Sequence, residues 1–454
     1  MKNLTLRNIA MACGGTYVGP EALADKEVVS ITTDSRTAEE GSLFVAIKGE
    51  RVDGHKFILP VMDKGALAVL CEQELCTHIP HIRVKSSLEA VKAIAEYYLA
   101  GLHIPVIGIT GSVGKTSTKE MIASILSQKY NTLKTLGNFN NELGLPLTVF
   151  RLRDEHQIAV LEMGISDFGE MTRLARVARP NTSVITNIGQ CHLENLIDRD
   201  GVLKAKTEVF DFLQPDGRAI LNGDDDKLHT VAEVNGQKPI FFGLDKKHDY
   251  YADQIESVGL KGTKCRIHTP EESFETLIPI PGRHMVYNAL AGTAVGISYG
   301  LTCEEIKKGI ESLQSLSGRF HIIEANGMTI IDDCYNANPV SMKASLGVLQ
   351  DGLGRKIAIL GDMGELGENE AQLHRGVGEY AATLDIDGVI CVGPLMNNLV
   401  EGIKSTNKDM YVIHLDTLDE LLTQLPELIQ AGDTLLVKAS HFMQFEKVVK
   451  QLEG

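Results

Sequence analysis

A glycine-rich stretch, GITGSVGKTSTKE at residues 108–120, has the residue types of a phosphate-binding loop. It joins an apolar run to a segment of helical pattern, so backbone N–H groups and the positive end of a helix dipole would converge on one anion. Lys115 would reach the terminal phosphates of a nucleotide, and the Thr116 hydroxyl would ligate Mg2+. The usual loop has a glycine where this chain has Ile109. An ordinary strand-to-helix turn with an incidental lysine is the alternative.

A carboxylate and an imidazole accompany two further apolar runs. Glu162 stands near the end of the run at residues 158–164, and His192 closely follows the run at residues 182–189. Because the carboxyl ends of strands in an open parallel sheet line one crevice, both side chains would point toward the phosphate loop. Glu162 could hold a metal near the γ-phosphate, and His192 could bind the same ion or a second one. Either residue alone is also typical of a loop cap.

The elements that would position these residues form about three domains, at roughly 100 to 200 residues each. In the first segment, residues 42–47 and 66–70 have the pattern of strands and residues 88–99 that of an amphipathic helix, with a boundary near residue 102. Apolar strands then alternate with helices, which predicts a parallel sheet covered on both faces. The strands are expected at residues 106–110, 158–164 and 182–189, and the helices from about residue 115, at 170–178 and at 202–212.

The third segment repeats this alternation after helices around residues 285–299 and 304–313. Its strands are expected at residues 328–333, 356–363, 388–393 and 433–440, which predicts a second parallel sheet. We therefore predict an α/β protein with three domains. They are a small N-terminal α/β domain at residues 1–102, a central parallel-sheet domain with the phosphate loop at residues 103–314, and a Rossmann-like parallel-sheet domain at residues 315–454.

Composition and charge disfavour several classes of protein. Lys and Arg total 44 against 60 Asp and Glu, and the formal net charge of −16 disfavours binding to nucleic acid or to an anionic membrane. No stretch approaches 18 apolar residues, and no interface pattern is evident, so we expect a cytoplasmic monomer without membrane insertion. The spacing of Lys206, close to Lys204, favours by itself a solvated helical face. The cysteines form no CxxC pair and indicate reduced thiols; they stand at positions 13, 71, 76, 191, 265, 303, 334 and 391.

Taken in order, a set of motifs resembles the signatures of the Mur ligase family. The family's loop reads Gly-x-x-Gly-Lys-Thr/Ser, which accounts for Ile109 at the position of the usual glycine. The match covers nearly the whole chain, and the ordered set is more specific than any one motif. The motifs are GSVGKTS at residues 111–117, NFNN at 138–141, LEMG at 161–164, TNIG at 186–189 with His192, AKTE at 205–208, His284 with Asn288, Gly318-Arg319, and DCYNANP at 333–339.

This resemblance implies an ATP-dependent ligase that joins a carboxylate to an amine. ATP would phosphorylate the carboxylate, and the amine would attack the acyl phosphate, with the third domain closing over ATP. The implied catalytic residues are Lys115, His192, Lys206 and Arg319. The implied nucleotide contacts are Gly111, Ser112, Val113, Gly114, Lys115, Thr116, Ser117, Asn288, Arg319 and Asp333. The implied ligands of Mg2+ are Thr116 for one ion, and Glu162 and His192 for a second.

Individual roles also follow from the resemblance. Lys206 matches the family's carbamylated lysine, in which CO2 converts the amine to an anion that supports the metal. Asn288 resembles the asparagine on the adenine side. Arg319 resembles the arginine that contacts the γ-phosphate, and Asp333 the aspartate that binds the ribose.

Within the family, three stretches resemble the members that add D-alanyl-D-alanine to UDP-N-acetylmuramoyl-tripeptide during peptidoglycan precursor synthesis. They are TDSR at residues 33–36 with FVA at 44–46, YNANP at 335–339, and LGDMGELG at 360–367. The residues that would contact these substrates are Asp34, Ser35 and Arg36 at the UDP-sugar end, Tyr335, Asn336 and Asn338 for the dipeptide, and Asn138. A plain turn is the alternative for residues 335–339.

Other functions remain as alternatives. The diaminopimelate-adding members are expected to carry an Asp-Asn-Pro-Arg stretch, which this chain lacks. Another amino-acid-adding Mur ligase or a folylpolyglutamate synthase would share the same core. A nucleotide-driven switch would hydrolyse ATP without a carboxylate substrate, and a binding protein would keep the fold without catalysis.

Overall fold

The computed structural model describes residues 1–49, 52–75 and 78–454 of the chain. Cys76 lies outside the described residues, and the other seven cysteines are free thiols. The chain divides into two compact units. The first comprises Met1–Thr110, Lys129–Val184 and Lys206–Ala219, and the second comprises Gly111–Gln128, Ile185–Ala205 and Ile220–Gly454. The three-domain division of the sequence stays a prediction.

A five-stranded sheet with the order β1-β5-β4-β3-β2 belongs to the first unit. Its strands are β1 (Thr16–Val18), β2 (Ile31–Thr32), β3 (Leu43–Val45), β4 (Ala68–Cys71) and β5 (His81–Arg83). β3 and β4 confirm the two strands that the sequence predicts here. β2 to β5 are parallel, and β1 pairs with β5 in the antiparallel direction. Phe44 and Val69 pack with Ile58 and Val61 of α3 (Ile58–Asp63) in one apolar cluster.

The helix expected at residues 88–99 is α4 (Ser87–Leu102). Its N-cap is Ser86, whose hydroxyl accepts the N–H of Glu89 at 3.3 Å. The helix ends at His103, which adopts a left-handed φ of 52°. Because Pro105 follows and would clash with a continued helix, the chain leaves α4 close to the boundary that the sequence predicts.

Four strands of a nine-stranded sheet lie in the first unit, except for the last residue of β9, in the order β9-β6-β8-β7. They are β6 (Val106–Thr110), β7 (Thr132–Lys134), β8 (Ile158–Glu162) and β9 (Thr182–Ile185). β8 pairs in parallel with both β6 and β7. Every residue of β6 and β8 is buried, as parallel strands covered on both faces require. On these strands pack α6 (Gly144–Val149) and α7 (Glu170–Ala178).

The other five strands of this sheet lie in the second unit, except for the first two residues of β10, in the order β14-β13-β12-β11-β10. They are β10 (Arg218–Asn222), β11 (Ile240–Gly243), β12 (Tyr250–Ser257), β13 (Thr263–His268) and β14 (Ser273–Ile278). The β10, β11 and β12 pairings are parallel, but β12, β13 and β14 are antiparallel. The sheet is therefore mixed and not wholly parallel. β13 alternates buried with more exposed residues, because antiparallel strands can leave one face of a sheet to solvent.

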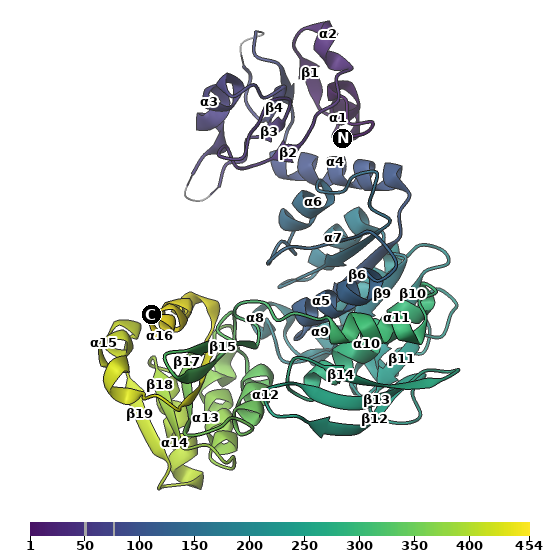
Figure 1. Ribbon diagram of the computed structural model, residues 1–454. Helices are drawn as coiled ribbons and strands as arrows, with labels where there is room; N and C mark the ends of the chain where they lie inside the picture. The colour runs from purple at the N-terminus through teal and green to yellow at the C-terminus, as the bar shows by residue number, and fades with distance from the viewer. Residues whose placement is uncertain (50–51, 76–77) are drawn as a thin grey trace. The chain divides into compact units, whose positions relative to one another are not determined.

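Helices of the second unit cover these strands (Figure 1). α5 (Lys115–Leu126) packs along α10 (His284–Ser298), and α11 (Cys303–Glu311) packs on both α5 and β14. Gly292 lets α5 and α10 approach closely, since a Cβ there would lie 2.6 Å from the Cδ1 of Ile125. The helix expected at residues 202–212 consists of α9 (Arg199–Thr207), which lies across the two units, and a 3-10 turn at Glu208–Phe212.

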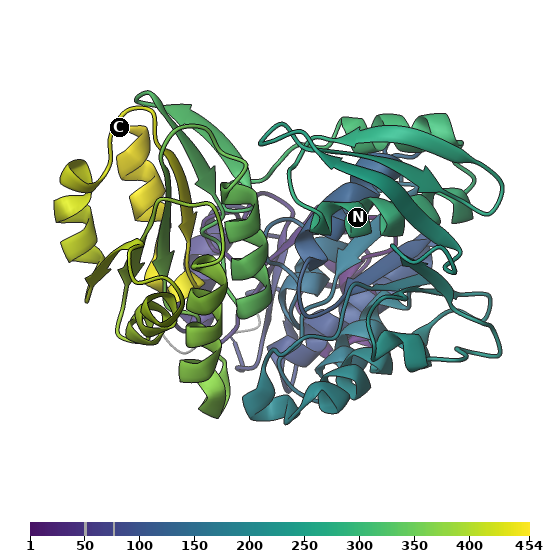
Figure 2. The same cartoon turned by 90° about the horizontal axis from the view of Figure 1, so that it is seen from below.

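A six-stranded sheet, also in the second unit, has the order β15-β16-β20-β17-β18-β19. Only the β15 and β16 pair is antiparallel among its pairings in the described chain. Its strands are β15 (His321–Ala325), β16 (Met328–Asp332), β17 (Lys356–Gly361), β18 (Gly388–Val392), β19 (Tyr411–Leu415) and β20 (Thr434–Lys438). Figure 2 shows α15 (Leu418–Leu428) and α16 (Glu446–Glu453), in yellow, on one face, and α12 (Pro339–Leu349) and α13 (Glu370–Ala381), in green, on the other. In the part of the chain that the structure describes, no helix has both the length and the apolar character needed to cross a membrane.

Candidate active site

The phosphate loop, residues 111–117, ends at the first turn of α5. Gly114 is the N-cap of this helix with a left-handed φ of 83°, so the unsatisfied N–H groups of the helix begin at the loop. Gly111 has a φ of 145°, and a Cβ there would lie 2.0 Å from the Thr186 hydroxyl. The ammonium group of Lys115 donates to the Gly111 carbonyl at 2.8 Å. Lys115 therefore folds back over the loop, as a lysine that reaches bound phosphates would.

The loop after β9 holds the phosphate loop in place. The Thr186 hydroxyl and the Asn187 amide group both donate to the carbonyl of Val113, at 2.6 and 2.9 Å. The side-chain oxygen of Asn187 accepts the N–H of Val113 at 3.0 Å, and its backbone carbonyl accepts the N–H of Ser112 at 3.0 Å. The N–H of Gly189 donates to the Ser112 hydroxyl at 2.8 Å. Five hydrogen bonds thus fix the first residues of the phosphate loop.

Arg319 lies against the start of α5. Its Nη2 is 3.5 Å from the Thr116 hydroxyl, and its guanidinium carbon is 4.0 Å from the ring centroid of Tyr335. The Tyr335 ring also stacks on His441, with the ring centroids 5.3 Å apart. The sequence predicts Arg319, Thr116 and Tyr335 as site residues, and the structure brings the three together. His441 was not predicted, because no motif distinguishes it in the sequence.

His192 adopts a left-handed φ of 51° as the N-cap of α8 (Leu193–Leu196). Its Nδ1 lies 3.0 Å from Oε2 of Glu365, in the LGDMGELG stretch. A carboxylate on one ring nitrogen fixes the ring orientation and makes the other nitrogen the better ligand. The contact is compatible with the metal role expected for His192, which stays a prediction.

In the first unit, Glu162 and Lys206 are both only 1% exposed. Glu162 accepts a hydrogen bond from the side-chain amide of Asn140 at 2.8 Å, and its backbone N–H donates to the Thr135 hydroxyl at 3.0 Å. Lys206 is buried whereas Lys204 is exposed, so Lys206 does not lie on a solvated face. Burial of a cationic amine is costly unless the charge is compensated or removed. The structure thus excludes the reading that the spacing of Lys206 favours by itself.

Comparisons with known proteins match this arrangement along nearly the whole chain. Three family models match: the Mur ligase family catalytic domain at residues 27–108, the Mur ligase middle domain at 109–296, and the Mur ligase glutamate ligase domain at 318–441. The UDP-N-acetylmuramoyl-tripeptide--D-alanyl-D-alanine ligase of Bacillus subtilis (strain 168) is 38% identical over 99% of this chain and 98% of its own length. The chain belongs to the Mur ligase family.

Solved structures of Mur ligases resemble this fold. A crystal structure of MurF from Acinetobacter baumannii has a TM-score of 0.90 and 34% identity, and the match covers 99% of this chain and 98% of that one. MurF from Thermotoga maritima in complex with ADP has a TM-score of 0.82 and 29% identity, with 93% and 97% covered. The α/β fold class predicted from the sequence is confirmed.

Two residues that the Mur ligase resemblance assigns to nucleoside binding are buried and make hydrogen bonds within the protein. Asn288, which is 6% exposed, accepts a hydrogen bond from the Thr118 hydroxyl at 2.9 Å and so ties α10 to α5. Asp333, also 6% exposed, accepts hydrogen bonds from the ammonium group of Lys438 at 2.5 Å and the hydroxyl of Ser345 at 2.7 Å. Lys438 was not predicted as a site residue, because it ends a strand that otherwise has the apolar pattern of a core strand. The roles of Asn288 and Asp333 in binding the nucleoside stay predictions.

The substrate residues expected in the first unit lie on its surface. Both carboxylate oxygens of Asp34 pair with the guanidinium group of Arg36, the nearest contact being 2.7 Å, and this lowers the pKa of Asp34 to about 2. The Ser35 carbonyl accepts a hydrogen bond from the ammonium group of Lys64 at 2.7 Å. Asn138 is exposed. Their contact with a substrate stays a prediction.

The YNANP stretch forms the entry to α12. Asn338 is the N-cap of this helix and accepts the N–H of Ser341 at 2.9 Å, so it has a structural role at the start of α12. Asn336 is exposed, and its carbonyl accepts a hydrogen bond from Lys438 at 3.0 Å. Capping of α12 by Asn338 does not decide whether the stretch also binds a substrate, and the expected dipeptide contacts of Asn336 and Asn338 stay predictions.

The residues around α5 suit a Mur ligase's nucleotide. A small pocket beside Thr116 and Arg319 is partly apolar, with Ile280, Met285 and Leu313 in its lining. The hydroxyl and carboxylate expected as metal ligands are oxygen donors of the kind that Mg2+ prefers. Within residues 1–49, 52–75 and 78–454, no group of three or more His, Cys, Asp and Glu residues could hold a metal ion by itself.

Proposed function

We propose that this protein is an ATP-dependent ligase that joins D-alanyl-D-alanine to UDP-N-acetylmuramoyl-tripeptide in the cytoplasm, in peptidoglycan precursor synthesis. The full-length similarity to a relative of that name supports this function. The structural observation that supports this function most is the position of Arg319 beside Thr116, at the end of the phosphate loop. The guanidinium group brings a positive charge to the place where a γ-phosphate would lie. A nucleotide switch would not need a carboxylate substrate, so substrate dependence separates the two.

The chemistry follows from the low reactivity of a carboxylate toward amines. An oxygen of the tripeptide's terminal carboxylate forms a bond to the γ-phosphorus of ATP. The bond between that phosphorus and the bridging oxygen breaks, and ADP leaves. The amine of D-alanyl-D-alanine then forms the new C–N bond, phosphate leaves with the C–O bond electrons, and the amine loses a proton. Holding the amine against the acyl phosphate can supply effective molarities of about 10^5 M or more.

Lys115 and Arg319 would bind the phosphates, together with Gly111, Ser112, Val113, Gly114, Thr116 and Ser117. Thr116 would hold one Mg2+, and Glu162 and His192 a second. Bound Mg2+ would neutralise the charge that develops on the phosphoryl oxygens. A carbamate on Lys206 would replace its buried positive charge with an anion that supports the metal, and the burial of Lys206 supports this assignment.

The remaining roles complete the substrate sites. Asn288 would lie on the adenine side, near the partly apolar pocket at Met285, and Asp333 would bind the ribose. Residues 1–102 would bind the UDP-sugar, residues 103–314 ATP, and residues 315–454 would close over ATP and bind the dipeptide. The substrate contacts would come from Asp34, Ser35, Arg36, Asn138, Tyr335, Asn336 and Asn338.

The deciding experiment measures ATP-dependent phosphate release with UDP-N-acetylmuramoyl-tripeptide, with and without D-alanyl-D-alanine, and identifies the product by mass spectrometry. We expect release that requires both substrates and a product carrying the added dipeptide. Equal release without either substrate would favour the nucleotide switch. A single amino acid or glutamate as the productive acceptor would make the protein another amino-acid-adding ligase or a folylpolyglutamate synthase.

A further inference from the structure

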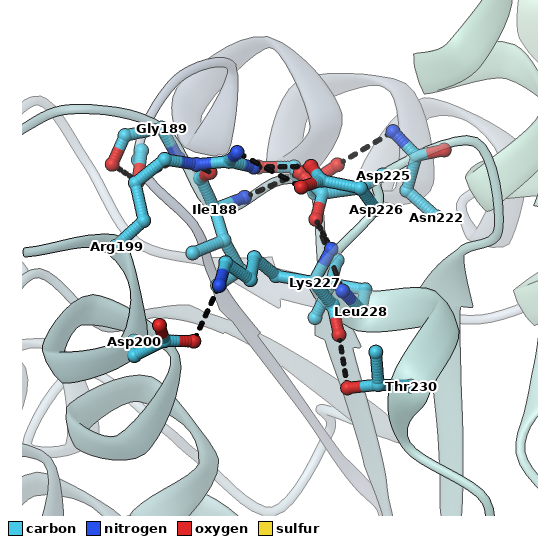
Figure 3. Close-up of polar contacts among 12 residues, drawn as sticks. Ile188, Gly189, Arg199, Asp200, Asn222, Asp225, Asp226, Lys227, Leu228 and Thr230 are labelled. Carbon is cyan, nitrogen blue, oxygen red and sulfur yellow. Dashed lines mark hydrogen bonds and ion pairs between the residues drawn. The ribbon is translucent and has the colours of Figure 1, made fainter.

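The acidic stretch NGDDDK, residues 222–227, begins at the last residue of β10 and makes hydrogen bonds to the loop that holds the phosphate loop in place (Figure 3). The carboxylate of Asp225 accepts the N–H of Ile188 at 2.8 Å. On the other side of the same residue, the Nε of Arg199 donates to the Ile188 carbonyl at 2.8 Å. The backbone of Ile188 is thus held at both of its polar groups, and its side chain is only 1% exposed.

The two gripping side chains are themselves fixed. The other carboxylate oxygen of Asp225 accepts the N–H groups of Lys227 and Leu228, both at 3.0 Å. Arg199 turns both ends of its guanidinium fork to the carboxylate of Asp226, and one of these contacts is 3.0 Å. The pairing lowers the pKa of Asp226, so this carboxylate stays ionised at neutral pH. A bidentate pair between a guanidinium group and a carboxylate fixes the orientation of both groups in addition to pairing their charges.

Ile188 stands between two residues that touch the phosphate loop. Asn187 makes paired hydrogen bonds with Val113, and Gly189 donates to the hydroxyl of Ser112. A displacement of the Ile188 peptide would therefore move both neighbours and, through them, the N–H groups of residues 112 and 113. Neither Asp225 nor Arg199 makes a hydrogen bond to the phosphate loop in the described contacts.

We propose that Asp225 and Arg199 are positioning residues that set the geometry of the phosphate loop through Ile188. They act on nucleotide binding and on phosphoryl transfer without contacting the substrate. This inference rests on the proposed function for its kinetic effect, but its effect on nucleotide binding requires only that the loop binds phosphates.

The test compares Asp225→Asn with a matched control in the same network. An asparagine has the same shape but only one acceptor oxygen, so it cannot serve Ile188 on one side and Lys227 and Leu228 on the other. Asp200→Asn is the control, because Asp200 is 71% exposed and pairs only with the Lys227 ammonium group among the contacts of Figure 3. Arg199→Lys keeps the charge but loses the fork, which separates geometry from net charge.

We expect Asp225→Asn to lower kcat/KM for ATP about tenfold and to weaken ADP binding in calorimetry, with KM for the UDP-sugar substrate unchanged. Arg199→Lys should change in the same direction, and Asp200→Asn should match the wild type. The proposal would be overturned if ADP affinity and ATP kinetics were unchanged in Asp225→Asn. It would also be overturned if kcat/KM fell equally for ATP and for the UDP-sugar substrate, in parallel with a fall in the melting temperature. If the wild type releases no phosphate with the peptidoglycan substrates, the proposed function fails while ADP calorimetry still tests the positioning role.

Discussion

Nη2 of Arg319 lies 3.5 Å from the hydroxyl of Thr116, although 203 positions separate the two residues in the chain. Thr116 belongs to the first turn of α5, whose N-terminus carries partial positive charge. The guanidinium group adds a full positive charge at the same place, and the face of Tyr335 holds it there. Two independent segments therefore supply the positive field that a transferring phosphoryl group needs.

The first prediction follows from this contact. Arg319→Ala should reduce kcat about 100-fold, because loss of a charged group that stabilises the transition state costs on the order of 3 kcal/mol. KM for the UDP-sugar should change little. Arg266→Ala serves as the control, since Arg266 pairs only with an exposed glutamate on the antiparallel hairpin among its described ion pairs. Steady-state phosphate release measures both variants, and an unchanged kcat in Arg319→Ala would refute the role of this arginine.

Lys206 offers a chemical test. Lys206→Ala should lose most activity, because the site would lose the anion that a carbamate supplies, and short carboxylates such as acetate should restore part of it. Lys204→Ala is a matched control two residues away on the exposed side of the helix and should remain active. Activity measured against acetate concentration gives the answer. Full activity of Lys206→Ala, or loss without any rescue, would contradict the carbamate.

Loss of the buried ion pair between Lys438 and Asp333 should lower the thermal stability of the protein. Their side chains are 3% and 9% exposed, and the nitrogen and oxygen atoms are 2.5 Å apart. Lys438→Met would leave the Asp333 carboxylate buried without its cation, which costs roughly 3 to 5 kcal/mol. Thermal unfolding should show a clear fall in Tm for this variant and none for Lys447→Met, where the lysine is exposed. Equal Tm values would mean that the pair contributes nothing.

His284 predicts a pH dependence of stability. Desolvation of the partly buried ring lowers the pKa of His284 from 6.5 to about 4 in the folded protein, while the charge of Asp333 opposes the shift and that of Lys438 adds to it. Below pH 6.5 the unfolded chain binds a proton that the folded chain does not, so the free energy of unfolding falls as the pH falls toward 4. This contribution is complete above about pH 6.5, and its loss reaches roughly 3 kcal/mol.

Urea unfolding of the wild type and His284→Gln between pH 4 and 7 measures this contribution. The variant should have a flatter pH dependence in that window, because it lacks the titrating ring. His229→Gln provides a control at an exposed histidine. Parallel pH curves for the wild type and His284→Gln would show that another group is responsible.

Local patterns in the sequence were enough to predict the elements that carry the site. The apolar run before the phosphate loop is β6, and the helix after it begins at Lys115 as expected. The strand that ends in Glu162 was also predicted, because a continuous apolar run is typical of a buried parallel strand. The antiparallel strands β12 to β14 were missed. In β12 a bulge shifts the register between Asp253 and Glu256, which interrupts the alternation along that strand.

Side-chain partnerships across long stretches of chain were beyond the sequence. Nothing in the pattern around Lys438 indicates that it meets Asp333, 105 residues away. The grip of Asp225 on Ile188 depends in the same way on tertiary folding, although the run of three aspartates is visible in the sequence. Lys206 shows the limit of spacing most directly, because its neighbours look like those of a solvated face and it is nonetheless buried.

Because Gly111 and Thr186 lie so close together, the residue at one position limits which residues are possible at the other. A methyl group on residue 111 would overlap the Thr186 hydroxyl, with its Cβ only 2.0 Å from the oxygen. Replacing Thr186 with a smaller residue that lacks the hydroxyl would remove this overlap, but the Val113 carbonyl would then lose one of its two side-chain donors. The two positions can therefore change only together. Any substitution that admits a larger residue at 111 also weakens the hydrogen bonds that hold the phosphate loop. A mutational library of this protein should accordingly accept alanine at 111 rarely, and only with a compensating change at 186.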